Sequence, residues 1–156
     1  MVKKVLFVCL GNICRSPTAE AVFRGKVRAL DLQHCIAQDS CGTSRYHVGE
    51  PPDNRAMAAA RKRGYDMSDL RGRQVSPEDF KQFDYILAMD RSNLSDLKRL
   101  APEPHAHKIE LFLKYSSSDE REVPDPYYGG GEGFDHVLDL VEDACEGLLQ
   151  RLQGDL

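Results

Sequence analysis

The 156-residue sequence predicts a single α/β domain over residues 1–156, with a four-stranded parallel sheet flanked by helices on both faces. Four candidate strands alternate with segments of helical periodicity, which is the pattern of parallel α/β sheets. The length fits one globular domain, as does the composition of 41% hydrophobic and 29% charged residues. No internal repeat, linker or low-complexity tract divides the chain.

The first half of the chain is expected to contain two strands and two helices. Residues 3–8 alternate little and are rich in Val, Leu and Phe, as in a strand buried on both faces of a sheet. From residue 16 to about residue 30 the apolar side chains recur at helical spacing. The other elements predicted here are a strand around residues 35–39, a polar loop over 40–52, and a helix over 54–63 with Asp53 as N-cap and Gly64 at its end.

The second half repeats the alternation. Ser76 followed by Pro77 indicates a helix N-cap with proline at the first helical position. The other elements predicted here are strands at 84–89 and 108–113, helices at 91–100 and about 134–152, and a Gly/Pro/Tyr loop over 124–133. Parallel α/β sheets bind ligands at the carboxyl ends of their strands, so the turn after the first strand is the first place to look for a site.

The charge distribution limits the classes of partner. The net charge is −4, so the sequence does not predict a nucleic-acid or anionic-membrane binder, which would need a basic surplus. The charge is uneven, however. The first 78 residues carry 13 basic and 8 acidic side chains, and the remaining 78 carry 8 and 17. An anionic ligand is therefore expected to bind in the first half.

The cysteines and the apolar runs indicate the compartment. No run approaches the ~20 apolar residues that span a bilayer, and we expect no signal peptide at the N-terminus. Five cysteines, an odd number, do not suggest a disulfide framework in a chain long enough to form its own core. We therefore expect a cytoplasmic protein, in which a functional cysteine is a nucleophile, a redox group or a metal ligand.

The turn from Cys9 to Pro17 has the composition of an anion cradle. Gly11 and Asn12 tolerate positive φ, so the backbone can curl until successive N–H groups point inward. A nest of N–H groups at a helix N-terminus binds phosphate-like dianions, and Arg15 adds a planar fork for two oxygens. The sequence therefore predicts a phosphate site here.

Cys9 lies at the floor of this cradle. Thiols beside cations and helix N-termini ionise more readily than free thiols, and Ser16 can donate a hydrogen bond to the thiolate. An anion hole above a nucleophile suits attack on phosphorus, which forms a phosphocysteine. A bare Cys-x5-Arg pair is more often structural, but the strand before it and the helix after it favour the functional interpretation.

Cys14 leaves two interpretations open. It could capture an oxidised Cys9 as a disulfide, or it could simply pack in the core. As a zinc pair, Cys9 and Cys14 have the wrong spacing and lack two further ligands nearby, so no metal is expected. The remaining cysteines, which carry no motif and are interpreted as structural, are Cys35, Cys41 and Cys145.

Asp125 is the candidate general acid. Pro124 and Pro126 restrict the backbone on either side of it and could direct the carboxylate. The adjacent Tyr127 and Tyr128 could form walls for an aromatic substrate. A surface turn in which Asp125 caps a helix fits the composition equally well. Outside this loop, Tyr46 is a further candidate wall, His47 and Glu50 could tune selectivity, and Asp90 could orient a site residue or cap the helix after it.

Taken together, these motifs resemble the low-molecular-weight protein tyrosine phosphatases. Residues 8–17 match the phosphate loop of that family, and residues 125–129 match its general-acid loop, about 110 residues further along the chain. Residues 83–87, 89–90 and 92–94 are also similar, so the resemblance covers nearly the whole chain.

The resemblance implies a Rossmann-like fold of the phosphotyrosine phosphatase I type and hydrolysis of phosphotyrosine and small aryl phosphates, with no metal and no cofactor. Cys9 would be the nucleophile, Arg15 the binder of the phosphoryl oxygens, and Asp125 the acid that protonates the phenolate and then activates water. The implied substrate-binding residues are Leu10, Gly11, Asn12, Ile13, Cys14, Ser16, Tyr46, Tyr127 and Tyr128, and the implied supports of the phosphate loop are Asn12, Ser16 and Ser40.

The implied partners are phosphotyrosine proteins and a tyrosine kinase acting on Tyr127 and Tyr128, with the chain a monomer or weakly self-associated. One position departs from the family. Many members carry a histidine within the segment corresponding to residues 67–74, where it tethers the loop asparagine. Here Asp69 or Leu70 takes that place, depending on alignment. Asp69 could replace the hydrogen bond, and Leu70 could not.

Three other functions fit less well. A thioredoxin-coupled arsenate reductase needs two further cysteines near the third strand, and residues 76–100 contain none. A phosphocysteine carrier of a sugar-transport system lacks the arginine that assists hydrolysis, whereas Arg15 is present. A catalytically dead phosphotyrosine-binding module would lack Cys9 or Asp125, and the chain has both.

Overall fold

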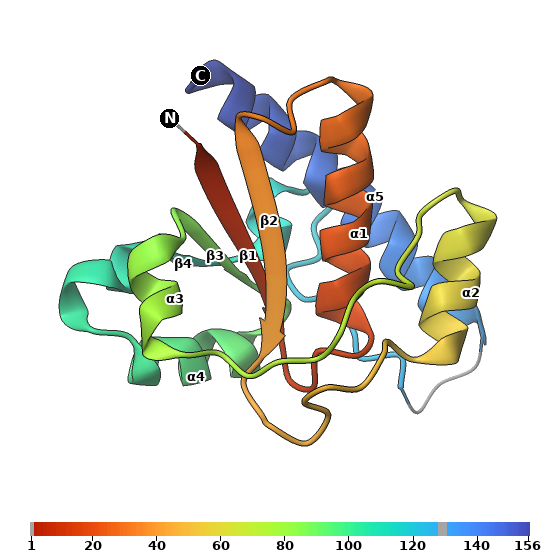
Figure 1. The fold of residues 1–156 in the computed structure, drawn as a ribbon, viewed down its shortest axis with the longest axis horizontal. Helices are drawn as coiled ribbons and strands as arrows, with labels where there is room; N and C mark the ends of the chain where they lie inside the picture. Colours follow the sequence, from red (N-terminus) through yellow and green to blue (C-terminus); the bar gives the residue numbers. More distant parts are fainter. Residues whose placement is uncertain (1, 128–130) are drawn as a thin grey trace.

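Strand β1 (Lys3–Cys9) lies at the centre of the sheet. In this computed structural model, which describes residues 2–127 and 131–156, β1 pairs in parallel with β2 (Ile36–Gly42) on one side and β3 (Tyr85–Ala88) on the other. β4 (Ile109–Leu111) pairs in parallel with β3, so the strand order is β2-β1-β3-β4 (Figure 1). The predicted four-stranded parallel sheet is confirmed.

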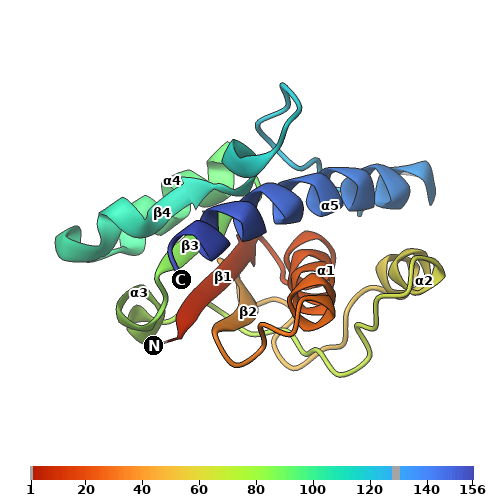
Figure 2. The same cartoon turned by 90° about the horizontal axis from the view of Figure 1, so that it is seen from above.

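Each face of the sheet is covered by its own apolar core. Along β1, Val5 and Phe7 point to one core, which α1 and α5 complete, and Leu6 and Val8 point to the other, to which α3 and α4 contribute. Figures 1 and 2 agree that α1 and α5 lie side by side, with α2 beyond α1 and away from the sheet. The helices are α1 (Arg15–Ala29), α2 (Asn54–Lys62), α3 (Pro77–Gln82), α4 (Arg91–Leu100) and α5 (Gly131–Gly154), and the 3₁₀ segments are η1 (Glu103–Lys108) and η2 (Phe112–Tyr115). Helices on both faces were expected from the apolar character of the first strand.

The predicted helix ends follow the expected capping chemistry. Asp53 accepts a hydrogen bond from the Arg55 N–H at the start of α2, and Gly64, just after this helix, has φ +88°. Ser76 and Asp79 form a reciprocal capping box at the start of α3, where Pro77 is the first residue. These signals were readable because they are local in the chain.

Several boundaries differ from the sequence prediction by one to three residues, and one 3₁₀ segment was not predicted. β2 continues to Gly42 where a polar loop was expected from residue 40, because its last residues pair with the end of β1. β4 ends at Leu111, and the apolar residues after it form η2, since strand β3 offers no more partners there. η1 was not predicted, and α5 begins at Gly131, three residues earlier than expected.

Among residues 2–127 and 131–156, no helix is both long and apolar enough to cross a membrane.

The carboxyl ends of β1 and β2 meet at one edge of the molecule, at the bottom of Figure 1. Gly42 ends β2 beside the loop that follows β1, and a Cβ there would lie 2.6 Å from the Leu10 carbonyl oxygen. Only a glycine allows this close approach. The two loop regions at this edge are therefore packed against each other, and the site forms here.

Candidate active site

The loop between β1 and α1 curls around the thiol of Cys9. Asn12 has φ +57°, and this left-handed turn brings its N–H within 3.2 Å of the Cys9 sulfur. The Ser16 hydroxyl, in the first turn of α1, lies 3.0 Å from the same sulfur. Cys9 and Arg15 stand at the two ends of the loop and are both buried. The loop therefore curls around the thiol as expected, with the Asn12 N–H and the Ser16 hydroxyl beside the sulfur.

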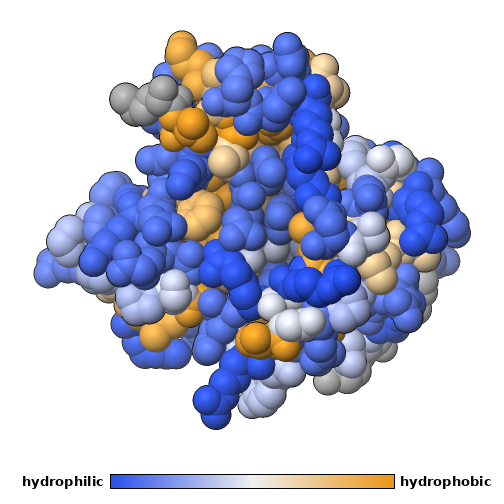
Figure 3. All heavy atoms as spheres, in the orientation of Figure 1, coloured by the Kyte–Doolittle hydropathy of each residue, from blue (hydrophilic) through white to orange (hydrophobic). Residues whose placement is uncertain are grey.

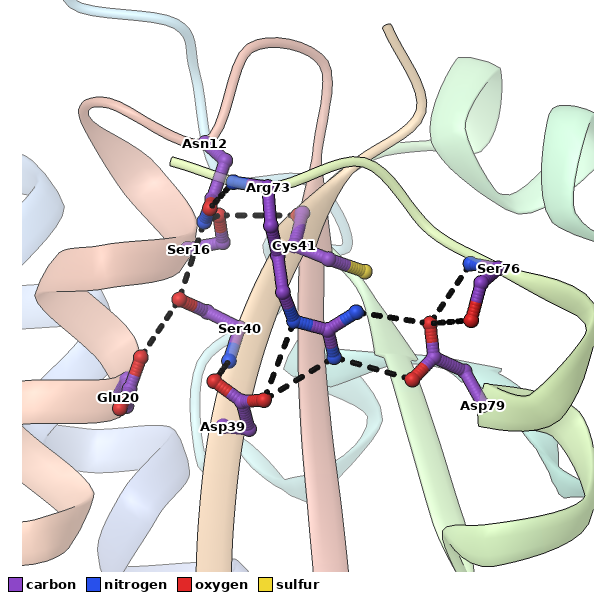
Figure 4. A network of polar contacts seen from close by, with 9 residues as sticks. All are labelled: Asn12, Ser16, Glu20, Asp39, Ser40, Cys41, Arg73, Ser76 and Asp79. Atoms are coloured by element: carbon purple, nitrogen blue, oxygen red, sulfur yellow. Dashed lines mark hydrogen bonds and ion pairs between the residues drawn. The ribbon is translucent and has the colours of Figure 1, made fainter. Parts of the chain in front are cut away.

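The side chain of Asn12 points away from the pocket and ties the loop to three other segments (Figure 4). Its Nδ2 donates to the hydroxyls of Ser16, at 2.8 Å, and Ser40, at 3.0 Å. Its Oδ1 accepts from the backbone N–H of Arg73 at 3.0 Å. Every polar group of the amide is thus engaged, which offsets the cost of its left-handed backbone.

Arg73 was not singled out by the sequence, yet it anchors the segment that reaches Asn12. Its guanidinium forms a two-pronged pair with Asp79, with both hydrogen bonds at 3.0 Å, and also contacts Asp39 at 3.1 Å (Figure 4). Its carbonyl accepts from the Gly42 N–H. Both the backbone and the side chain of Arg73 are held, so the bond to Asn12 comes from a rigid segment.

Neither residue considered as a replacement for the family histidine supports the loop. Asp69 is exposed and pairs with Arg24 at 2.8 Å, and Leu70 is buried in the apolar core. The backbone N–H of Arg73 supplies the tether that the histidine was expected to provide.

Glu20 extends the network and was also missed. The Ser40 hydroxyl donates to its Oε1 at 2.6 Å, and the carboxyl is buried on α1, one turn after Ser16. Burial raises the pKa of Glu20 to about 7, although the hydrogen bond from Ser40 acts in the opposite direction. The spacing from Ser16 to Glu20 along the buried face of the helix was the available signal.

We expect Glu20 to make stability pH-dependent. Its carboxyl has a pKa near 4.5 when unfolded and about 7 when folded, so between these values the folded state binds more protons. Stability therefore falls as pH rises through this window, by about 3 kcal/mol, and levels off above it. Glu20→Gln should remove this slope in urea unfolding measured from pH 4.5 to 8. Glu103→Gln, at an exposed position, is the control, and parallel curves for Glu20→Gln and wild type would contradict the prediction.

The guanidinium of Arg15 donates hydrogen bonds to two buried or partly buried oxygen atoms. Its Nη1 donates to Asp90 Oδ2 at 2.6 Å and to the Val123 carbonyl at 3.0 Å, and the residue is only 3% exposed. Burial disfavours its charge, but the proximity of Cys9 and Asp90 raises its pKa overall. Asp90 also caps α4 by accepting from the Asn93 N–H at 2.8 Å. Both roles considered for Asp90 are therefore present.

Asp125 faces the cradle from the opposite side. Its Oδ2 lies 3.7 Å from Nη2 of Arg15, and its Oδ1 accepts from the Tyr127 N–H at 3.0 Å. The carboxyl is 44% exposed, so water and substrate can reach it. The two motifs that lie far apart in sequence are thus brought together.

A pocket of about 430 Å³ opens between these groups. The molecular face in Figure 3 is largely hydrophilic, and its apolar side chains lie in small separate areas. Several exposed apolar side chains line this pocket. Tyr46 is 82% exposed at its rim. The lining residues are Cys9, Leu10, Gly11, Ile13, Cys14, Arg15, Tyr46, His47, Asp125 and Tyr127. Of the residues expected to bind substrate, Asn12 and Ser16 lie behind the loop, and Tyr128 falls outside the described residues.

Cys14 lines the pocket but is largely buried at the start of α1. Burial, together with the nearby Asp53, raises the pKa of its thiol to about 12, so it is a neutral thiol at neutral pH. Cys14 is therefore not the first thiol to be oxidised, and it would have to lose its proton to attack the sulfur of an oxidised Cys9. Its redox role stays a prediction.

Comparison with known proteins agrees with this geometry. Residues 4–156 match the family model described as low molecular weight phosphotyrosine protein phosphatase. The chain is 49% identical to the Schizosaccharomyces pombe protein of that name over 89% of this chain and 90% of the relative, and 44% identical to the human one over 96% and 95%. A crystal structure of a protein tyrosine phosphatase from Entamoeba histolytica, with Hepes in its active site, superposes with a TM-score of 0.94 at 46% identity, covering 99% of both chains.

Proposed function

The chain belongs to the low molecular weight phosphotyrosine protein phosphatase family and hydrolyses phosphotyrosine, and from this premise we propose that Cys9, Arg15 and Asp125 carry the reaction. The observation that supports this assignment is that all three line one pocket although Asp125 is distant in sequence. A thiol, a guanidinium and a carboxyl group thus surround the same space.

In the first step the Cys9 thiolate attacks phosphorus and a P–S bond forms as the P–O bond to the aryl group breaks. Hydrogen bonds from the Asn12 N–H and the Ser16 hydroxyl stabilise the thiolate before attack. Asp125, protonated at this stage, gives its proton to the departing phenolate oxygen, so a neutral phenol leaves.

In the second step a water molecule attacks the phosphocysteine. Asp125, now a carboxylate, takes a proton from that water, the P–S bond breaks, and inorganic phosphate leaves with the Cys9 thiolate restored. Arg15 serves both steps because its guanidinium is oriented by Asp90 and the Val123 carbonyl before substrate binds. A preorganised cation stabilises charge on the phosphoryl oxygens without reorganisation during the reaction.

The pocket walls select an aromatic leaving group. Leu10 and Ile13 rise from the phosphate loop, and Tyr46 and Tyr127 approach from two other loops, so a phenyl ring is flanked by apolar surface. This arrangement favours aryl phosphates over phosphates on short polar side chains, because ring burial contributes binding only in the first case.

Asp125→Asn is expected to lower kcat/KM by ~10²–10⁴-fold for aryl phosphates with poor leaving groups, because these need the proton most. For good leaving groups the loss should be much smaller. The measurement is kcat/KM across a series of phenols of different pKa. Asp119→Asn, at a position outside the pocket, serves as the control. A leaving-group dependence identical to that of wild type would remove Asp125 as the acid.

We further propose phosphotyrosine proteins as substrates in the cytoplasm, and a tyrosine kinase acting on Tyr127 and Tyr128 as a partner. Five free thiols suit a reducing compartment, and Tyr127 is 37% exposed at the pocket mouth. We propose a monomer or weak self-association in solution.

A further inference from the structure

We propose that Arg55, in the first turn of α2, is a positioning residue that holds the loop carrying Asp125 over the phosphate loop. This inference rests on the proposed role of Asp125 as the general acid. Arg55 does not line the pocket and was not identified from the sequence. It is nevertheless the meeting point of contacts from three segments.

The guanidinium of Arg55 is fixed on one edge by Asp53. Its Nε lies 3.2 Å from Asp53 Oδ1, and its Nη2 lies 3.1 Å from Asp53 Oδ2. Asp53 also accepts from the backbone N–H of Arg55 at 2.8 Å, so the carboxylate is itself held by the start of the helix. The direction in which the guanidinium points is thus set within α2.

The other side of the guanidinium engages the acid loop. Nη2 donates to the Tyr127 carbonyl at 2.8 Å, and the cation lies 5.5 Å from the centre of the Tyr127 ring. It also lies 4.8 Å from the ring of Phe134, in the first turns of α5. Arg55 therefore holds the backbone and the ring of one residue of the loop against two helices.

The backbone of Tyr127 connects Arg55 to Asp125. The Tyr127 N–H donates to Asp125 Oδ1 at 3.0 Å while its carbonyl accepts from Arg55. With Oδ1 occupied, Oδ2 is the oxygen that faces Arg15, at 3.7 Å. The orientation of the acid therefore depends on where Arg55 places Tyr127.

The loop needs such an external support. The Val123 N–H donates to the Met89 carbonyl, but Pro124 and Pro126 have no N–H to donate. Backbone hydrogen bonding can therefore tie down only part of this segment. The link also continues to the cradle, because the Asp53 N–H donates to the Ile13 carbonyl of the phosphate loop at 2.8 Å. The chain of contacts joins both halves of the active site.

Lysine can replace arginine only partly in this role. The planar guanidinium bonds Asp53 and the Tyr127 carbonyl together while it stacks on rings, whereas an ammonium is a single point of charge. Arg55→Lys is therefore expected to keep only part of the function, and Arg55→Ala to lose it. Both variants should fold, because Arg55 is about half exposed and fills no core position.

The test measures kcat/KM for the same series of aryl phosphates in Arg55→Ala, Arg55→Lys, Asp125→Asn and the double variant Arg55→Ala/Asp125→Asn. Arg61→Ala, which removes an exposed arginine from the same helix, is the matched control. We expect Arg55→Ala to lose about 10- to 100-fold with poor leaving groups, since small misplacement of a catalytic group has effects of this size. Good leaving groups should be little affected, Arg55→Lys should be intermediate, and Arg61→Ala should match wild type.

In the Asp125→Asn background, Arg55→Ala should cause no further loss, because the group it positions is already disabled. The rate of Cys9 alkylation by iodoacetamide as a function of pH should also match wild type, since the phosphate loop keeps its own supports. An equal loss for all leaving groups, or an additional loss in the double variant, would overturn the proposal. If Asp125→Asn itself left the leaving-group dependence unchanged, the proposed acid and this inference would fail together. If Asp125→Asn showed the expected leaving-group dependence and Arg55→Ala did not, this inference would fail and the role of Asp125 would stand.

Discussion

Cys9→Ser is expected to reduce turnover of aryl phosphates by at least about 10⁴-fold, since removing a catalytic nucleophile has effects of this size or larger. Serine keeps the size and the hydrogen bonds of the cradle, but its hydroxyl does not ionise at neutral pH, so no nucleophile remains. The loop should still bind phosphate, because its N–H groups and Arg15 are unchanged.

The measurement is steady-state hydrolysis in the presence of a metal chelator, together with inorganic phosphate binding by calorimetry. Cys35→Ser is the matched control, because Cys35 is half-buried in the turn directly before β2 and does not line the pocket. Equal rates in Cys9→Ser and wild type would disprove the phosphocysteine route.

Arg15→Lys should lower kcat/KM by about 10³-fold or more, the size of effect known for arginines that stabilise a transferring phosphoryl group. Lysine keeps the charge but cannot bond Asp90, the Val123 carbonyl and two phosphoryl oxygens with a single nitrogen. The inhibition constant for inorganic phosphate should weaken in the same variant, because the fork is lost in the ground state as well.

Arg45→Lys gives the matched comparison, since it makes the same change on the exposed loop beside Tyr46. Its kcat/KM and phosphate inhibition should equal those of wild type. If Arg15→Lys retained both values, Arg15 would be a structural partner of Asp90 and not the phosphate binder.

The local parts of the site were readable from the sequence because their geometry depends on neighbouring residues. The left-handed turn at Asn12, the start of α1 after the strand and the cap at Asp90 all lie within a few residues of the signals that predict them. Asp125 was found because prolines and tyrosines around it form a second local pattern, although a surface turn fitted that pattern equally well.

The supports of the site were not readable in the same way. Arg73 reaches Asn12 across 61 positions through a backbone N–H, which any residue type except proline could supply. Arg55 lies 72 positions from Tyr127 and contacts a carbonyl. Since backbone groups carry no sequence signature, contacts to them are visible only in the folded chain.

By itself the sequence determined a parallel α/β sheet and the family, and it predicted a phosphate-binding loop with Cys9 and Arg15. Only the tertiary structure decided that Arg73, and not Asp69, tethers Asn12, and that Glu20 is buried within that network. It also decided that Arg55 bonds the Tyr127 carbonyl, in the loop that carries Asp125. The reason is that local backbone preferences are encoded by adjacent residues, whereas contacts between distant segments depend on how the sheet and helices pack.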